Sequence, residues 1–184
     1  DGGEAYTSRE RAGRRERTAD RAMDPREQTL ELVDRIYAAA LDPDGWQPAL
    51  AALSEALGGA ALHLSIRLPT GDASDADPVI RVHLDAGYHP AFLRHVVEAL
   101  PWHSFDRDRI AAGFVRASDL LERGPIEKTA FYREFMRPQG LAAESPHVHL
   151  IASSDKRPLA GMAVYRRVGC RPLRAADLEL LDAL

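Results

Sequence analysis

The sequence predicts an α+β domain in which a central antiparallel β-sheet carries helices on both faces. Three observations predict this fold class. Apolar residues recur at a period of two in residues 61–68, 79–84 and 147–165, which is typical of strands. They recur at helical spacing in residues 30–41, 46–57 and 175–184. The strands fall between the helical segments, so we expect the N- and C-terminal helices on one face and a helical crossover on the other.

The first helix is expected to follow a charged segment that cannot form a core. Residues 1–23 alternate Arg and Glu with few apolar side chains, so we expect an N-terminal arm ahead of one domain at 24–184. Asp24 and Glu27 have the spacing of a capping box, with Pro25 at the first helical position. The stripe expected to pack against the sheet is Leu30, Val33, Ile36, Tyr37, Ala40 and Leu41.

A second helix and a β-hairpin are expected next. The apolar stripe of the helix is Trp46, Leu50, Leu53 and Leu57, and Gly58 and Gly59 end it. The period then changes to two. One phase of the two expected strands is apolar: Leu62, Leu64, Ile66, Leu68, Ile80, Val82 and Leu84. The other phase is polar: His63, Ser65, Arg67, Arg81 and His83.

The middle of the chain predicts a helical crossover around a third strand. Residues 88–100 form a helix that Pro90 begins and Pro101 ends. The segment 113–121 is expected to be a strand followed by a turn, with Ser118 as a cap. Residues 126–136 are again helical and rich in aromatic side chains, and Pro138 and Gly140 stop them.

The clearest hairpin lies at residues 146–167. Val148 and Leu150 alternate with His147 and His149, and a polar turn at 153–156 leads into a strand in which Met162 and Val164 share a face. A final helix follows, with Leu178, Leu181 and Leu184 on one side. Because the chain starts without Met and this pattern continues to Leu184, we expect a fragment of a longer protein.

Composition excludes several classes of protein. A net charge of −4, with six Arg in residues 1–22 offset by five acidic residues, offers no basic patch for nucleic acid. The sequence has no apolar run long enough for a membrane span and no secretion signal, and its single Cys170 cannot form an internal disulfide. We therefore expect a cytoplasmic protein with no membrane partner.

Four histidines fall on the polar phase of the expected strands: His63, His83, His147 and His149. We expect His63, His83 and His149 on one face of the sheet, opposite Leu64, Val82 and Leu150. Such a face can line a ligand pocket or remain solvated. His-x-His on one strand can also bind a metal, but no second histidine pair or carboxylate completes a site, so we expect no metal.

The aromatic residues lie between the strands, where a crossover could enclose an apolar ligand. No nucleophile elbow, phosphate-binding loop or dinucleotide fingerprint is present, so we expect neither an enzyme nor a cofactor. The residues expected to bind an unknown small molecule are His63, Ser65, His83, Tyr88, Trp102, Phe131, His149 and Tyr165.

Several segments between about Leu30 and Leu184 also share the pattern of a known family. They are IYAAALDPDGWQPALAALSEALGG, ALPW followed by AAG, KTAFYREFMRPQGL and a closing L-x3-D-L-x-L-L. These segments resemble the N-terminal sensory half of LuxR-type helix-turn-helix transcriptional regulators. The resemblance implies a PAS- or GAF-like sheet, a homodimer and a DNA-reading domain after the last helix. That domain is absent from this chain, so contact with DNA would be indirect.

Quorum-sensing members of that family hold an acyl-homoserine lactone with Trp, Tyr and an Asp. Tyr88, Phe92 and Trp102 resemble the aromatic spacing, but Leu100 and Pro101 stand where an Asp-Pro pair would support a lactone. The identity of the ligand therefore stays open. Two other functions also stay open, namely a dimerisation module without a ligand and a small cytosolic enzyme.

Overall fold

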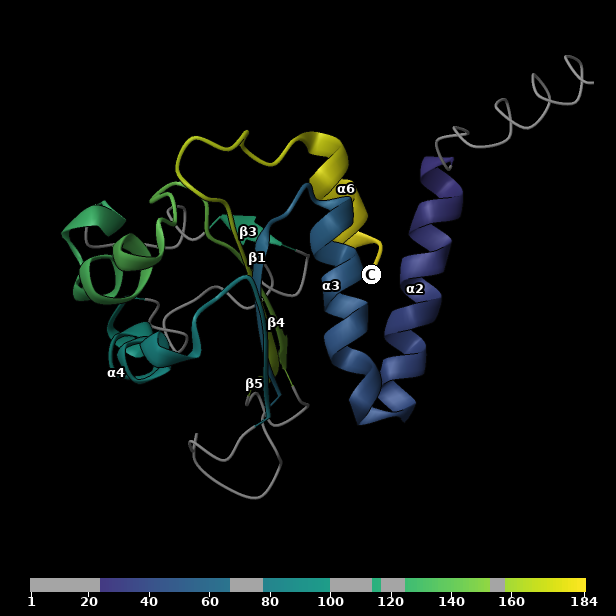
Figure 1. Cartoon of the computed structure of the whole chain (residues 1–184), viewed down its shortest axis with the longest axis horizontal. Helices are drawn as coiled ribbons and strands as arrows, with labels where there is room; N and C mark the ends of the chain where they lie inside the picture. The colour runs from purple at the N-terminus through teal and green to yellow at the C-terminus, as the bar shows by residue number, and fades with distance from the viewer. Residues whose placement is uncertain (1–23, 67–77, 100–113, 117–124, 153–157) are drawn as a thin grey trace, which may run out of the picture. The chain divides into compact units, whose positions relative to one another are not determined.

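A five-stranded antiparallel sheet forms the centre of the fold in the residues that the computed structural model describes, which are 24–66, 78–99, 114–116, 125–152 and 158–184 (Figure 1). The strand order is β2-β1-β5-β4-β3. The strands are β1 (Ala61–Ile66), β2 (Val79–Val82), β3 (Val115–Arg116), β4 (His147–Ala152) and β5 (Pro158–Tyr165). Both predicted hairpins are present, and the α+β class is confirmed.

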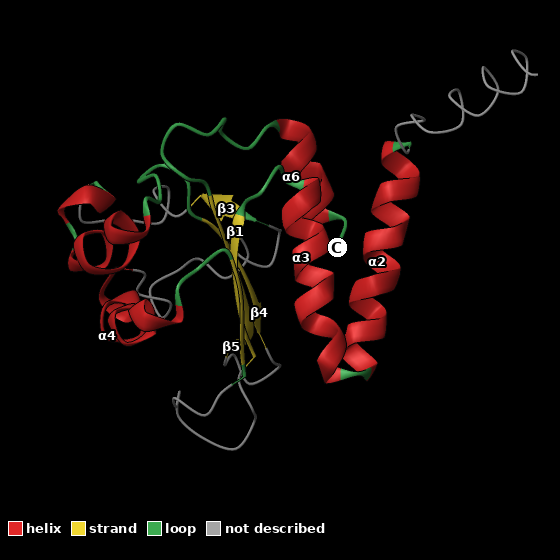
Figure 2. Cartoon of the chain, viewed as in Figure 1, coloured by secondary structure: helices red, strands yellow, loops and turns green. Residues whose placement is uncertain are grey.

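Four helices of at least two turns accompany the sheet in the described ranges (Figure 2). They are α2 (Pro25–Leu41), α3 (Trp46–Ala56), α4 (His89–Ala99) and α6 (Ala175–Asp182). Contacts divide the chain into two compact units, residues 1–31 and 32–184, and the sheet belongs to the second. Of the first unit the structure describes residues 24–31. The predicted boundary between arm and domain at residue 23 stays a prediction.

Local sequence signals explain how α2 begins and ends. The Asp24 carboxylate accepts a hydrogen bond from the Arg26 amide at 3.0 Å, as the predicted N-terminal cap requires. After Leu41, the Asp42 carboxylate accepts from the Asp44 amide at 3.2 Å and starts the short turn η1 (Pro43–Gly45). A Cβ on Gly45 would lie 3.0 Å from the Ala39 Cα, so a larger residue here would require the end of α2 to shift by a few tenths of an ångström.

The apolar stripe predicted to pack α2 against the sheet is wrong in part. Leu30, Tyr37 and Leu41 are exposed by 65%, 69% and 90%, whereas Leu32 and Ala39 are buried. At 3.6 residues per turn, Leu32 and Ala39 lie on the side of the helix opposite the other three. The sequence carries apolar residues on both sides of α2, and the smaller set is the buried one.

One face of the sheet packs against α3 and α6, as predicted. Leu50 and Leu53 of α3, with Leu57 just after it, are fully buried, and Leu181 of α6 joins the same cluster. The sheet residues in this cluster are Leu62, Leu64, Val82 and Val164. Gly58 and Gly59, at φ 67° and 77°, end the α3 segment where the sequence predicts.

The other face packs against α4 and a series of short turns, which is the predicted crossover. The turns are η2 (Ala86–Tyr88), η4 (Ile126–Lys128), η5 (Tyr132–Met136) and η6 (Arg137–Gln139). The predicted single helix at 126–136 is wrong in part, because Thr129 ends η4 with an extended backbone (φ −80°, ψ 154°) and separates it from the π-helical turn η5. Gly140, at φ 68°, ends the last turn, η6.

The expectation that His149 shares a face with His63 is wrong. In the β4–β5 register His147 pairs with Val164 and His149 with Met162, and both partners belong to the cluster under α3 and α6. The His149 ring accordingly lies 5.2 Å from the ring of Phe114, on that side. Because helices cover both faces, polarity along β4 cannot show which phase faces which layer, and the register with β5 decides it.

His83 is not a strand residue, which corrects a second expectation. Strand β2 ends at Val82, and His83 is exposed with a left-handed φ of 56°. This turn breaks the period of two, so Leu84 packs against the cluster under α4 and not with Val82. Ser118, like Trp102, lies outside the described residues.

A buried arginine connects the end of β5 to both covering helices of the α3 face. Arg166 is 5% exposed, and its guanidinium donates to the carbonyls of Leu57 and Gly58 at the end of α3. Its Nε donates to the Arg171 carbonyl at 2.8 Å. Arg171 in turn forms a two-pronged ion pair with Asp177 of α6. One side chain thus satisfies carbonyls that the helix leaves open.

Replacing Arg166 by Met should lower the free energy of unfolding by about 2–3 kcal/mol, because buried carbonyls lose a charged donor. Urea denaturation measures the change. The matched control is Arg167→Met, which removes the neighbouring exposed arginine and should cost less than about 1 kcal/mol. Equal losses in the two variants would contradict the role given to Arg166.

Candidate functional site

His63 lies in the middle of β1, on the sheet face that α4 covers. Only 2% of its surface is exposed. Its ring centroid is 4.1 Å from that of Phe92 and 6.2 Å from that of His89, both on α4. The alternation of β1 places His63 here, because Leu62 and Leu64 face the opposite cluster.

The surroundings of His63 hold its imidazole neutral. Burial, with smaller contributions from the charges of Arg81 and His89, lowers its pKa from 6.5 to about 3. The Nε2 atom is buried and has no hydrogen-bond partner among the described residues. Leaving such an atom unsatisfied costs about 1–3 kcal/mol, and a buried polar group of this kind is uncommon in folded proteins.

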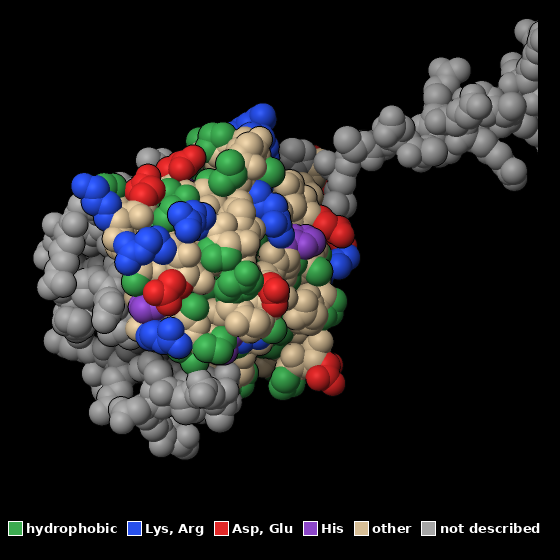
Figure 3. All heavy atoms as spheres, turned by 60° about the vertical axis from the view of Figure 1, so that its left-hand side comes forward, with side chains coloured by type: hydrophobic (Ala, Val, Ile, Leu, Met, Phe, Trp, Pro, Cys, Tyr) green, Lys and Arg blue, Asp and Glu red, His purple; other side chains and the backbone are tan. Residues whose placement is uncertain are grey.

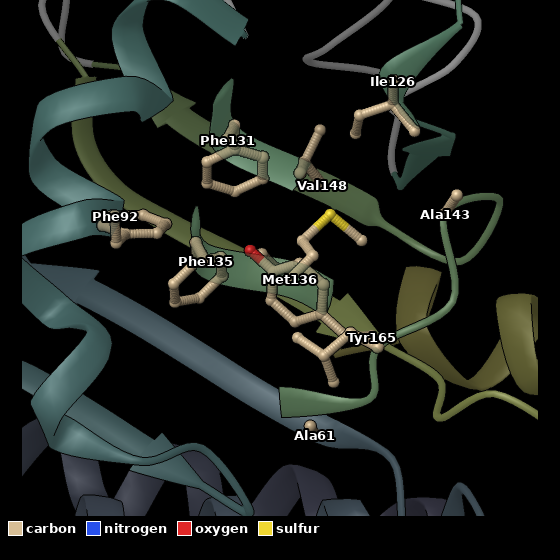
Figure 4. Close-up of a cluster of buried hydrophobic side chains, with 11 residues drawn as sticks. Ala61, Phe92, Ile126, Phe131, Phe135, Met136, Ala143, Val148 and Tyr165 are labelled. Carbon is tan, nitrogen blue, oxygen red and sulfur yellow. The ribbon is translucent and has the colours of Figure 1, made fainter. Parts of the chain in front are cut away.

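Aromatic rings form the layer above this histidine. We call Phe92, Phe131, Phe135 and Tyr165 the aromatic cluster. Neighbouring ring centroids in it lie 5.0–6.0 Å apart. Figure 4 shows these side chains with Met136 between the turns and the strands. Tyr165 is 1% exposed, and burial raises the pKa of its hydroxyl, so it stays a neutral phenol.

An ion pair at the edge of this layer fixes α4 against η5. The Nε2 atom of His95 lies 2.8 Å from a carboxylate oxygen of Glu134, and Arg94 lies 3.5 Å from the same oxygen. The hydrogen bond with His95 is the main reason why the pKa of Glu134 is lowered. This contact joins the two elements that carry Phe92 and Phe135.

The structure brings together some of the predicted ligand-binding residues. His63, Phe131 and Tyr165 are buried on this face, and Tyr88 packs against the same cluster. Ser65 shares the strand phase of His63, with its Oγ 3.4 Å from the Gly161 carbonyl. His83 and His149 lie elsewhere, and Trp102 falls outside the described residues.

Three residues of this site are missing from the expected ligand-binding set, although the family resemblance singles out Phe92 for its spacing. Phe92 and His89 contact His63 from α4, and Arg81 stands directly across from it on β2. In the sequence Arg81 and His63 both lie on the polar phase of their strands, and this shared phase is the signal that could have placed Arg81 in the site. The length of the loop between the strands leaves their register open, so the pairing of the two could not be read from the pattern.

No protein-family model matches the chain, and no curated protein does. The chain is similar in structure to a solved protein, CepR2 from Burkholderia cenocepacia, described as an N-acylhomoserine lactone dependent LuxR family transcription factor. The match covers 85% of this chain and 88% of that one, at 20% identity and a TM-score of 0.48. A likeness at this level leaves the function to be argued from the site itself.

Within the described ranges, no three His, Cys, Asp or Glu side chains come together as a set of metal ligands. In the same part of the chain, none of the helices has the length and apolar character that crossing a membrane requires.

Acid should destabilise the domain through His63. Between the folded pKa of about 3 and the ordinary 6.5, the unfolded chain binds a proton at His63 and the folded chain does not. Stability therefore falls as the pH falls through this window. From about pH 7.5 to about pH 5, the protein should lose about 2 kcal/mol more than a His63→Gln variant.

Urea denaturation at both pH values measures this difference. His149→Gln on the opposite sheet face is the matched control, because His149 is less buried than His63. If His63→Gln showed the same acid dependence as the wild-type protein, His63 would not be a buried neutral imidazole.

Proposed function

We propose that this domain is the ligand-sensing domain of a LuxR-type transcription regulator and that it binds a small molecule against the sheet face covered by α4. The observation that carries the proposal is the unpartnered Nε2 of His63 within an apolar, aromatic layer. Small-molecule sites are mostly apolar with a few polar groups that fix orientation. A ligand that hydrogen-bonds to this nitrogen would remove the cost of burying it.

The contacts around Arg166 suggest how binding would be transmitted. Tyr165 belongs to the aromatic cluster, and the next residue, Arg166, contacts the end of α3 and the loop before α6. Arg171 of that loop pairs with Asp177 in α6. A ligand that favours one position of Tyr165 would therefore bias α6, which is a population shift between two conformations.

In the proposed mechanism, ligand binding acts on a helix-turn-helix domain, which follows the last helix in the regulators that the sequence resembles. The charge of the chain supports an indirect route to DNA. On the face in Figure 3 basic and acidic side chains are interspersed, and the net charge is −4. A surface that neutralises phosphates needs clustered Lys and Arg.

The test is retention and stabilisation by a ligand. Protein purified under native conditions should carry a bound small molecule in its native mass spectrum, or gain thermal stability from members of a small-molecule library. At a ligand concentration of about 100 times Kd the gain should be about 2.7 kcal/mol. His63→Leu should lose both signals, since it removes the polar anchor.

The matched control for this test is His149→Gln, which changes a histidine on the opposite face and should keep both signals. Protein that carries no small molecule and gains no stability from any compound would contradict a sensing role. Equal losses in the two variants would move the site away from His63.

A second candidate function, a dimerisation module, is favoured by the exposed side of α2. Leu30, Tyr37 and Leu41 present large apolar surface at 65–90% exposure and at helical spacing. Such a stripe is suited to pairing with the same stripe of a second copy across a twofold axis.

Replacing both Tyr37 and Leu41 by Lys should convert a dimer into a monomer in sedimentation velocity, because the charges would have to be desolvated at the interface. The control is Val168→Lys, which places the same charge at another exposed apolar residue. A buried residue such as Leu53 would not serve, because its replacement would disturb the core. A wild-type protein that stays monomeric at high concentration would exclude this function.

A further inference from the structure

We propose that the ligand of this site carries a carboxylate, which binds between the guanidinium of Arg81 and the imidazole of His63. This inference rests on the proposed sensing function and names the chemical class of its ligand. Three features of the described residues carry it: the position of Arg81, its lack of an acidic partner among them, and the apolar side chains beside His63.

The position of Arg81 follows from the strand register. Arg81 and His63 are directly opposed in the antiparallel pair of β1 and β2, so their side chains leave the sheet on the same face. Opposed residues of this kind have Cβ atoms roughly 4.5–5.5 Å apart. The charge of Arg81 also contributes to the lowered pKa of His63, as expected for two neighbouring groups.

Arg81 is a partly buried cation without a compensating anion among the described residues. Burial lowers its pKa, and in the part of the chain that the structure describes no carboxylate contributes an opposing shift. Other arginines of this domain do have such partners: Arg171 pairs with Asp177, and Arg94 lies near Glu134. A partly desolvated guanidinium with no anion beside it is costly to keep, unless an anion binds there.

A carboxylate satisfies both groups, whereas a neutral ligand satisfies only one. The planar guanidinium donates two parallel hydrogen bonds to a carboxylate, and the same anion can accept from a protonated Nε2 of the neutral imidazole. An amide or ester could bond to His63 but would leave the charge of Arg81 uncompensated. The class of ligand that fits both groups is therefore a carboxylic acid.

The rest of the ligand is expected to be aromatic or otherwise apolar. The Phe92 ring centroid lies 4.1 Å from that of His63, with the two rings tilted by 35°, and Tyr88 and Leu93 pack against the same cluster. These side chains provide no ion and few hydrogen-bonding atoms. A compact acid such as an arylacetate or a medium-chain fatty acid matches one charged end and one apolar body.

The experiment compares acids with their neutral amides of the same shape. Phenylacetate and octanoate are titrated against the protein beside phenylacetamide and octanamide, with binding followed by calorimetry and by thermal unfolding. We expect at least one acid to bind about 10–100-fold more tightly than its amide, which is the range for hydrogen bonds to a charged group.

Two variants test whether Arg81 causes the difference in affinity between acid and amide. Arg81→Gln should reduce the affinity for the acid to that for the amide, and the variant without ligand should melt no lower than the wild-type protein. Arg137→Gln, at an exposed arginine of η6, is the matched control and should bind acid like the wild-type protein.

Four outcomes would overturn the inference. Acid and amide binding equally, or acid binding that survives Arg81→Gln, would leave a pocket but exclude a carboxylate anchor. Failure of both acids to bind, in protein that retains another small molecule, would leave sensing in place with the wrong ligand class. A ligand-free Arg81→Gln variant with a clearly lower melting temperature would show that Arg81 serves the fold.

Discussion

The pairing of β5 with a strand on each side is the constraint on which the rest of the structure depends. Its residues are hydrogen-bonded to β1 along one edge and to β4 along the other. The alternation of β5 therefore decides which of its side chains enter each layer. Met162 and Val164 face α3 and α6, whereas Ala163 and Tyr165 face the opposite layer, which contains the rest of the aromatic cluster. A shift of one residue in this register would exchange the two sets and turn Tyr165 towards α3 and α6.

The same constraint would give the proposed signal a short route from the sheet to α6. Tyr165 and Arg166 are consecutive and point to opposite layers, so a displacement of one is mechanically tied to the other. Arg166 has no room for adjustment, because its guanidinium is buried among carbonyls from two segments. The contacts from Tyr165 through Arg166 and Arg171 to Asp177 form one continuous path.

Much of the fold could be predicted from periodicity, because helices and strands differ in where their apolar residues recur. The hairpins, the caps at Asp24 and Gly140, and the assignment of His63 to a polar phase all follow from local sequence. Long-range pairing could not be predicted in this way. His149 faces the α3 layer because of its register with β5, and the left-handed turn at His83 has no signal in the sequence.

Site residues can be predicted from a sequence where the pattern shows that a polar side chain is buried. The pattern shows this poorly here, because both faces of the sheet are covered. His63 and His149 have the same strand phase relative to their apolar neighbours, yet the first is fully buried and the second is only partly buried. What separates them is a partner. His63 has Arg81 across the strand and Phe92 above it, and both contacts need the folded register. The proposed site therefore rests on a pair of polar groups that have no compensating partner among the described residues, and only the assembled sheet brings them together.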